Sequence, residues 1–481
     1  MAGIGFELKK IYKKKHIFNI LQGIGYSTIV TVGPTLITIG IILIMHQLLE
    51  AMDVQYAERE LLSSTILYVF IFSLIVTTPF NAVWSRYIAD KLFQRKLEDI
   101  LPAYYTGLTV VTLILAIISV PFFIRLYLVS NLGALFVFSS YCFLVSVAIV
   151  FFSMTFLTAT KDYRIITIHF ILGMLIALIS GYLFVQIWDI VIIKGILYAL
   201  TIGFFFIAVG EFTYIKKYFY ISSGNYLESL QYIFQFKRLF FSGLFYILGL
   251  YCHNFVAWTT DLGIIVANSY ISAPTYDMAT FLAMLTNIST MVIFIVIVET
   301  SFHDRYQTYS EAVIRSTLRD IEKAKNDMFR LLIQQISYVI QVQAIITCIL
   351  FLVVVIFLPS FGFSGIIMHI YPALTAGYFV MFIMYCNLIF LYYFNDMTGA
   401  FLTSLVFFAG VLAGSIIATR FNLRFYGMGA FFGAMSGWVV SFFRLYYLEK
   451  HFDAHIFRKG RLILTKKENM PSQVVYKKEL N

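Results

Sequence analysis

The chain has 481 residues, of which 60% are hydrophobic and 12% charged, and its mean hydropathy is +0.85. A soluble globular domain carries about 25% charged residues, so a water-soluble fold is excluded and the lipid bilayer must be the solvent for most of the surface. The apolar stretches are continuous over about 20 residues instead of alternating, which excludes an outer-membrane β-barrel and predicts membrane-spanning helices.

The chain opens with five lysines between Lys9 and Lys15, followed by an apolar run that continues to about Met45. This run is too long for the hydrophobic region of a signal peptide, and no A-x-A cleavage site ends it, so we interpret it as the first membrane helix. Eleven similar runs follow. The twelve predicted spans cover about residues 19–46, 61–84, 103–124, 133–159, 165–187, 192–215, 238–258, 278–301, 336–358, 371–394, 398–419 and 427–448.

Lysine and arginine alternate between the predicted loops as the positive-inside rule requires for twelve spans with both termini in the cytoplasm. The cytoplasmic segments then hold 30 of the 35 basic residues, and the external loops hold 5. The same distribution explains the net charge of +10, because the basic residues cover one membrane face, where they attract anionic lipid. No single basic domain remains that would indicate nucleic-acid binding.

The two halves of the chain share a pattern. A cytoplasmic loop at 216–237 separates six spans from six, and the pair Arg-Tyr follows the second span of each half, at 86–87 and 305–306. This predicts an all-α membrane protein of two six-helix bundles, related by a pseudo-twofold axis along the membrane normal, with a transport path between them. The predicted parts are an N-terminal bundle (1–215), an inter-bundle loop (216–237), a C-terminal bundle (238–448) and a basic cytoplasmic tail (449–481).

Ionisable and polar groups are rare in the predicted spans and are candidates for the transport path or its gating. Arg86, Glu299 and Arg305 are predicted at the cytoplasmic mouth, where an ion pair between Glu299 and Arg305 or gating between the halves would account for them. The deeper candidates are predicted either to line a cavity or to form hydrogen bonds between helices. They are Asn81, His253 and Asn254.

Three other polar features have ordinary interpretations. Glu211, near the cytoplasmic end of span six, is predicted to snorkel or to pair with Lys216 or Lys217. Asp277 is assigned to a mildly acidic external loop. The segment 304–333 is predicted to be a polar amphipathic helix, which is either a solvated surface or a docking face for a cytoplasmic partner.

Proline and glycine mark breaks and close contacts. Gly33 and Pro34 interrupt span one, and Pro79 interrupts span two, so we predict helix breaks at both places. Glycines recur at four-residue spacing in the last two spans, which predicts close packing between them. They are Gly410 and Gly414 in span eleven and Gly429, Gly433 and Gly437 in span twelve.

Motifs for chemistry are missing from the sequence. There is no P-loop and no G-x-S-x-G nucleophile elbow, so nothing indicates an ATPase or another enzyme, and no cofactor is expected. His451 and His455 flank Asp453 at a spacing that could bind a metal, but no fourth ligand lies nearby, and we expect no metal. All four cysteines lie in apolar runs, which indicates packing instead of disulfides.

Several stretches resemble one family over essentially the whole chain. "MAGIGFELKKIYKKK", the Gly-Pro of span one, "SRYIADKLF" after span two and "VETSFHDRY" at the end of span eight are similar to the PelG family. These are inner-membrane transporters of Pel exopolysaccharide, within the multidrug/oligosaccharidyl-lipid/polysaccharide exporter superfamily. The resemblance implies export of a growing amino-sugar-rich polysaccharide for a biofilm matrix. It also implies a cytoplasmic glycosyltransferase (PelF-like) and other Pel membrane proteins as partners.

Two alternatives remain from the residues alone. One is a flippase for lipid-linked oligosaccharides, which composition cannot separate from a polysaccharide exporter. The other is an ion-coupled exporter of small molecules, which predicts a deep acidic residue in an N-terminal span. Spans one to five hold none at mid-depth by the boundaries above.

Overall fold

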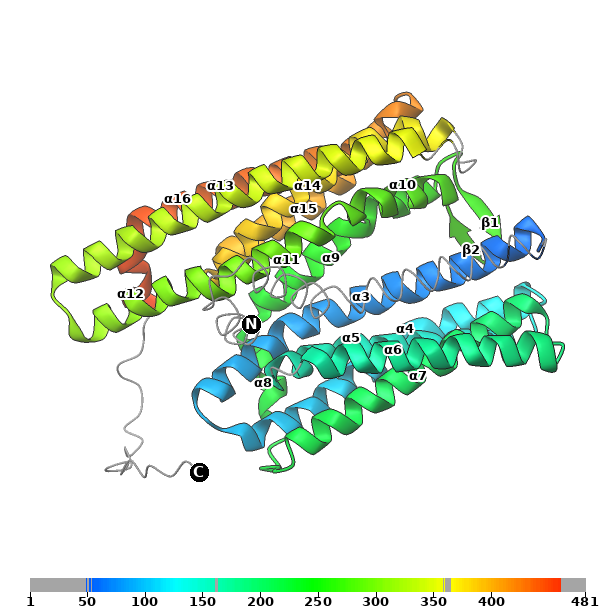
Figure 1. Cartoon of the computed structure of the whole chain (residues 1–481), viewed down its shortest axis with the longest axis horizontal. Coiled ribbons are helices and arrows are strands. Elements are labelled where there is room, and N and C mark those ends of the chain that lie inside the picture. The colour runs from blue at the N-terminus through cyan, green and yellow to red at the C-terminus, as the bar shows by residue number, and fades with distance from the viewer. Residues whose placement is uncertain are drawn as a thin grey trace, which may run out of the picture.

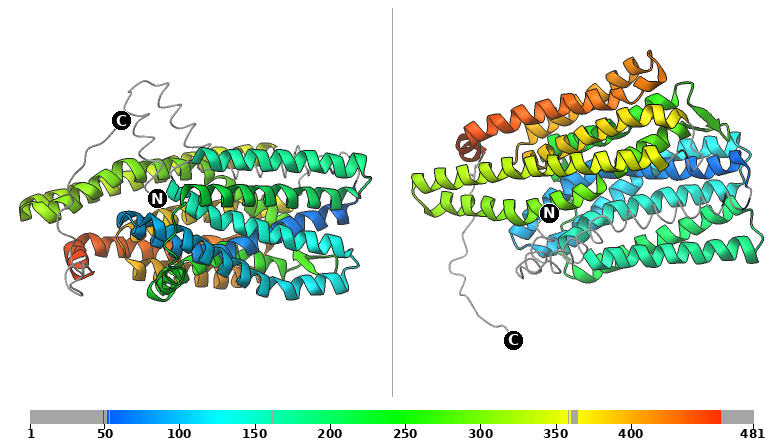
Figure 2. Two further views of the ribbon diagram at one scale, coloured as in Figure 1. Left: turned by 90° about the horizontal axis from the view of Figure 1, so that it is seen from below. Right: turned by 45° about the horizontal axis from the view of Figure 1, so that its top comes forward.

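The structure is a computed structural model that describes residues 54–160, 163–357 and 365–459, together with Leu49, Met52 and Pro359. Nearly all of this part is helical, and the long helices run along the longest axis of the molecule (Figures 1 and 2). The helical elements are α3 (Tyr56–Phe93), η1 (Leu97–Asp99), α4 (Ile100–Val129), α5 (Ala134–Thr160), α6 (Tyr163–Tyr182), η2 (Leu183–Ile187), α7 (Ile192–Tyr218), α8 (Glu228–Gln235), α9 (Lys237–Trp258), α10 (Pro274–Leu285), α11 (Ile288–Ile297), η3 (Val298–Phe302), α12 (His303–Arg315), α13 (Leu318–Phe357), α14 (Gly365–Tyr393), α15 (Met397–Ala418), η5 (Leu423–Phe425) and α16 (Met428–Lys459).

Eleven helical segments in the described residues are long and apolar enough to cross a membrane. They correspond in order to the predicted spans two to twelve. The predicted first span, with the predicted break at Gly33 and Pro34, lies outside the described residues. The largest difference in boundary is at span nine, where α13 begins at Leu318, well before residue 336, because the polar segment ahead of the apolar run continues the same helix.

Helices α3 to α7 form one group, which Figure 1 shows in blue to green along its lower side. Helix α5 packs against α3, α4 and α7, and α6 packs against α7. Small residues permit the closest approach: a Cβ on Gly203 of α7 would lie 2.7 Å from the carbonyl oxygen of Gly173 on α6. Without a hydrophobic driving force between helices in lipid, such backbone contact is a principal source of helix association.

Helices α9 to α16 form the second group. Its densest contact joins α15 and α16 through the predicted glycines, since a Cβ on Gly433 would lie 2.3 Å from the backbone nitrogen of Val411. A Cβ on Gly429 would lie equally close, at 2.3 Å, to the backbone nitrogen of Ser415. The predicted close packing of the last two spans is confirmed.

The expectation of an all-α fold is corrected by one small sheet. Strands β1 (Ile264–Val266) and β2 (Tyr270–Ser272) form an antiparallel hairpin between α9 and α10, with Ile265 opposite Ile271. Two residues of the turn, Ala267 and Asn268, have positive φ, which a tight hairpin turn requires. We call the end of the molecule that carries this hairpin the hairpin end, and the opposite end the α8 end (Figure 1).

The polar segment 304–333 is not one helix, as predicted, but parts of two. Helix α12 ends at Arg315, and α13 begins at Leu318 after an extended Ser316. Thr317 explains the new start, because its hydroxyl accepts from the Asp320 backbone N–H (3.4 Å), as an N-cap side chain does, and donates to the Asp320 carboxylate (2.7 Å). The two helices extend past the rest of the α8 end (Figure 2).

Helix α16 holds this pair of helices in place. Asp453 accepts hydrogen bonds from the Lys325 ammonium of α13 and from the Tyr309 hydroxyl of α12 (3.1 Å). Burial and the neighbouring Asp453 carboxylate raise the pKa of Tyr309. The histidines that flank Asp453 do not join it: His455 donates to the Phe394 carbonyl (3.0 Å), and His451 is exposed. Among the described residues, no cluster of three or more His, Cys, Asp or Glu is placed to hold a metal.

Candidate functional site

The two helix groups meet along α3 and α9, whose contacts run from Tyr68 and Trp258 to Phe80 and Phe240. At the hairpin end the contact is aromatic. Tyr68 stacks on Trp258 with ring centroids 5.2 Å apart and planes at 4°, and Phe72 stacks on Phe255 at 6.1 Å. The Tyr68 hydroxyl also donates to the carbonyl of Ile271 (2.8 Å) and accepts from its backbone N–H (3.0 Å).

The hairpin adds to this contact. The hydroxyl groups of Ser64 on α3 and Ser272 on β2 lie 3.1 Å apart. Tyr270 is buried among residues of the first group, with its ring edge against Tyr68 (5.0 Å) and Phe122 (5.4 Å). A hairpin that belongs to the second group in sequence therefore closes onto the first group in space.

In the middle of the interface, backbones approach closely. A Cβ on Gly243 of α9 would lie 3.1 Å from the Cα of Pro79 on α3. Helix α3 nevertheless continues through Pro79 without interruption, so the predicted break of span two is not observed. Close packing against α9 holds the segment around the proline, and Phe80 adds an edge contact with Phe240 at 5.1 Å.

Towards the α8 end the interface becomes charged. Arg86 pairs with Asp90 one turn later (3.2 Å), and its guanidinium lies 5.7 Å from the ring centroid of Phe236. Burial raises the pKa of Tyr306 on α12, and the Arg86 charge opposes that shift, while Arg305 beside Tyr306 is exposed. The two predicted Arg-Tyr pairs thus come near each other at the α8 end. The side chain of Glu299 lies outside the described residues.

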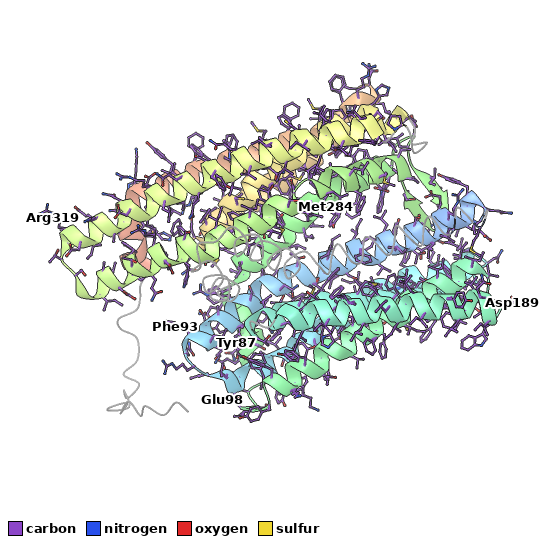
Figure 3. The ribbon with its side chains drawn as sticks, viewed as in Figure 1. Tyr87, Phe93, Glu98, Asp189, Met284 and Arg319 are labelled. Carbon is purple, nitrogen blue, oxygen red and sulfur yellow. The ribbon has the colours of Figure 1, made fainter. Side chains whose placement is uncertain are left out.

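A buried ion cluster ties the inter-bundle segment to the first group. Lys91, whose side chain is 3% exposed, binds Asp99 at 2.6 Å and Glu228 of α8 at 2.7 Å. Asp99 also accepts from the Ser223 hydroxyl (2.6 Å). Figure 3 shows this corner of the molecule beside Tyr87 and Glu98. The sequence predicts only that Lys91 lies in a cytoplasmic segment, because Ser223 and Glu228 are far from it in the chain.

The second group contains a polar cluster at the hairpin end. Asn254 donates to Asp277 (2.8 Å), and the Trp258 indole N–H donates to the same carboxylate (3.0 Å). His253 Nδ1 lies 3.0 Å from the Tyr276 hydroxyl, while its Nε2 is buried without a hydrogen-bond partner among the described residues. Asp277 is therefore not a loop acid, as predicted, but the first-turn residue of α10, where the helix dipole favours its charge.

Span eight is interrupted in the middle, which the sequence does not reveal. Helix α10 ends at Leu285 and α11 begins at Ile288, next to Met284 in Figure 3. Asn287 at the break donates to the Tyr378 carbonyl (3.0 Å) and accepts from the Gln343 amide (2.7 Å). Discontinuous helices that line substrate or ion sites are frequent in transporters. Neither proline nor glycine occurs here, so the usual signal is missing.

The remaining predicted residue, Asn81, points away from the interface. Its amide donates to the Phe151 carbonyl of α5 (3.1 Å), and its Oδ1 is buried without a partner among the described residues. Of the predicted path residues, Arg86 lies at the interface. His253 and Asn254 lie on α9 and are buried within the second group. Asn81 joins two helices of one group.

The arrangement of helices defines the fold of the protein, which is that of the MATE transporters. An outward-facing multidrug resistance MATE transporter of the MOP superfamily superposes with a TM-score of 0.61 and 12% identity, covering 89% of this chain and 96% of that chain. A variant of the Vibrio cholerae MATE transporter VcmN gives 0.61 and 12%, with 94% and 99% covered. An inward-facing MATE transporter of the MOP superfamily gives 0.52 and 14%, with 82% and 91% covered.

Comparison with family models assigns the chain to a narrower group of proteins than the fold does. The family model "PelG: Putative exopolysaccharide Exporter (EPS-E)" matches residues 1–457, and the chain belongs to this family. The resemblance drawn from the sequence motifs is therefore confirmed. A search of curated proteins finds no match.

Proposed function

We propose that this protein exports a growing Pel-type, amino-sugar-rich polysaccharide across the bacterial cytoplasmic membrane to a biofilm matrix. The observation that carries the proposal is the family match over residues 1–457. The α3–α9 interface supports it, because a seam between two helix groups offers a route that can open at one end at a time. We propose that the chain has twelve spans in two six-helix bundles related by a pseudo-twofold axis, with both termini cytoplasmic.

Polymer secretion tests this function. The gene is deleted in the bacterium that encodes the protein, and amino-sugar polymer is measured separately in the medium and in the cytoplasm. We expect secreted polymer to disappear while cytoplasmic polymerisation remains possible. Secretion that continues unchanged would refute the proposal. Loss of a lipid-linked oligosaccharide from the outer leaflet, with polymer export intact, would favour the flippase instead.

The projecting helices α12 and α13 support a proposal about partners. Ile314 and Leu318, next to the turn between the two helices, are 77% and 73% exposed. Large apolar side chains at the tip of a polar helix pair are typical of a protein contact. We propose that a cytoplasmic glycosyltransferase of the same export machinery docks here, so that the polymer enters as it is made. Other Pel membrane proteins are proposed as further partners.

Co-purification tests this contact. The double variant Ile314→Glu/Leu318→Glu should lose the glycosyltransferase from a detergent-solubilised complex. Phe93→Glu/Leu97→Glu, which changes exposed apolar residues at the α8 end on the first helix group, controls for general effects of charge. Equal recovery of the glycosyltransferase with wild type and with the tip variant contradicts the docking proposal. For gating, Arg305→Ala and Glu299→Ala are expected to impair export without loss of protein from the membrane. Normal export in both variants would refute their role.

A further inference from the structure

Glu211 is a fully buried carboxyl group inside a membrane helix. It lies about two turns before the end of α7 at Tyr218 and is 0% exposed. Both of its carboxyl oxygens are without a hydrogen-bond partner in the described part of the chain. Lys216 and Lys217 are exposed, so the predicted pairing or snorkelling is wrong. Glu211 is instead buried on α7, a helix that packs against α5 and α6.

An ionised carboxylate in this position would be unstable. Removing a charge from water without pairing it carries a large penalty, and in practice such a group takes up a proton and becomes neutral. Ionisable residues inside membrane helices are rare for this reason and mark ion or proton pathways. We propose that Glu211 is a proton-binding site, and that its loading and release are linked to movement of the first helix group. The proposal rests on the proposed function only in taking the chain as a transporter.

One group near Glu211 could stabilise its ionised form by donating a hydrogen bond. The Tyr104 hydroxyl on α4 lies within electrostatic reach of Glu211 and is 2.8 Å from the Ser153 hydroxyl on α5. Tyr104 and Ser153 are both fully buried. On α6, His169 packs against Gly210, the residue before Glu211, and its Nδ1 is buried without a described partner. Tyr104, Ser153 and His169 thus bring polar groups from α4, α5 and α6 to this region of the first helix group.

Release of the proton would require rearrangement. An ionised Glu211 needs a hydrogen-bond donor. Tyr104 can supply one by leaving Ser153, or by turning its O–H towards Glu211 while it accepts from the Ser153 hydroxyl. Tyr104 lies on α4 about one and a half turns after Asp99, which is bound to Lys91 and to Ser223 of the inter-bundle segment. A shift of α4 against α5 would therefore reach the ion cluster at the α8 end. The proton site and the segment joining the two helix groups thus share one helix.

Carbodiimide labelling tests for the proton directly and needs no sugar substrate. Dicyclohexylcarbodiimide enters apolar regions and reacts with protonated carboxyl groups. The acid O–H adds across one C=N bond to give an O-acylisourea, which rearranges to a stable N-acylurea with no atom lost. We expect mass spectrometry of the purified full-length protein to show modified Glu211 at neutral pH. The extent should fall at alkaline pH, approaching about tenfold per pH unit once most of the site is ionised.

Three comparisons make the labelling result decisive. Glu211→Gln should abolish the label, and Glu98→Gln, which changes an exposed acid at the same end, should leave it unchanged. Asp99, paired with Lys91, should stay unmodified. No label on Glu211 at any pH, or equal labelling of Asp99 and Glu211, would overturn the proposal.

A distance measurement tests the link to movement. Spin labels are placed in a cysteine-free background at Phe93 and Ile314, which are exposed at the α8 end on the two helix groups. We expect the distance distribution of the otherwise wild-type protein to change between neutral and alkaline pH, and that of Glu211→Gln to stay the same. Equal responses in both proteins, or no response in either, would refute the link. Lost export with labelling and movement intact would count against the polysaccharide function alone.

Discussion

Replacement of Lys91 by methionine probes the ion cluster that joins the inter-bundle segment to the first helix group. Methionine keeps the length and apolar stem of lysine and removes only the ammonium group. Asp99, whose side chain is 9% exposed, would then be left without its cation, while Glu228, at 31%, can turn to water. Removing one partner of a buried pair costs about 3–5 kcal/mol. Because Glu228, one of the two carboxylates, can be hydrated again, we expect the free energy of unfolding to fall by about 3 kcal/mol, near the lower limit.

The first assay is thermal unfolding of the purified protein, followed by tryptophan fluorescence, to which the buried Trp84 contributes. The second assay is limited proteolysis of the segment 219–236. Lys91→Met should lower the melting temperature and expose this segment to cleavage. Lys217→Met, which removes an exposed charge at the same end, is the matched control. The double variant Lys91→Met/Asp99→Asn should regain much of the loss. A melting temperature equal to wild type, or a double variant worse than the single one, would refute the reasoning.

Three other perturbations have defined outcomes. Gly433→Ala should lower thermal stability by about 1–3 kcal/mol, since its Cβ would meet Val411 at 2.3 Å. Gly365→Ala, whose Cβ meets nothing within 4 Å, should leave stability unchanged. Equal melting temperatures of the two variants would contradict the predicted clash. Tyr68→Phe keeps the ring stack but removes both hydrogen bonds to Ile271, so hydrogen exchange of the hairpin amides should speed up while α15 exchange stays constant. The pKa of Tyr309 is raised in the folded protein above its ordinary value of 10.0. The stability that Tyr309 contributes is therefore complete below pH 10.0 and is lost as the pH rises beyond that value. When unfolding is followed between neutral and strongly alkaline pH, Tyr309→Phe should lose less stability at alkaline pH than wild type.

The membrane helices could be predicted because each needs one local property, an apolar run of sufficient length. Their ends were harder to predict, since polar residues such as Arg319 and Lys323 continue the helix of α13 into water. The hairpin could not be predicted because strands of three residues carry almost no alternation signal. The four-residue spacing of glycines did predict the α15–α16 contact, because the spacing itself defines one helix face.

The candidate site was predictable only in part, because its contacts join residues far apart in the chain. Arg86 was noted from the repeated Arg-Tyr pair, but its position beside Phe236 depends on how α8 folds back. Pro79 is predicted to break its helix, yet α3 continues through it. Span eight is instead interrupted at Asn287, where the Gln343 amide donates to the Thr286 carbonyl (3.4 Å) and to the Asn287 side-chain oxygen (2.7 Å). Glu211 was assigned to nearby lysines because helix rotation cannot be read from a uniformly apolar sequence.

The contact between Tyr68 and Ile271 has a consequence for how the hairpin end can open. Ile271 presents both its N–H and its C=O to one phenol, so the free edge of β2 ends on a side chain of the other helix group. Because both hydrogen bonds depend on one phenol, separation of the two groups would break them together and would also part the Tyr68 ring from Trp258 and Tyr270. Contacts that are lost together favour two states, so this end should be either shut or fully released, instead of opening by degrees.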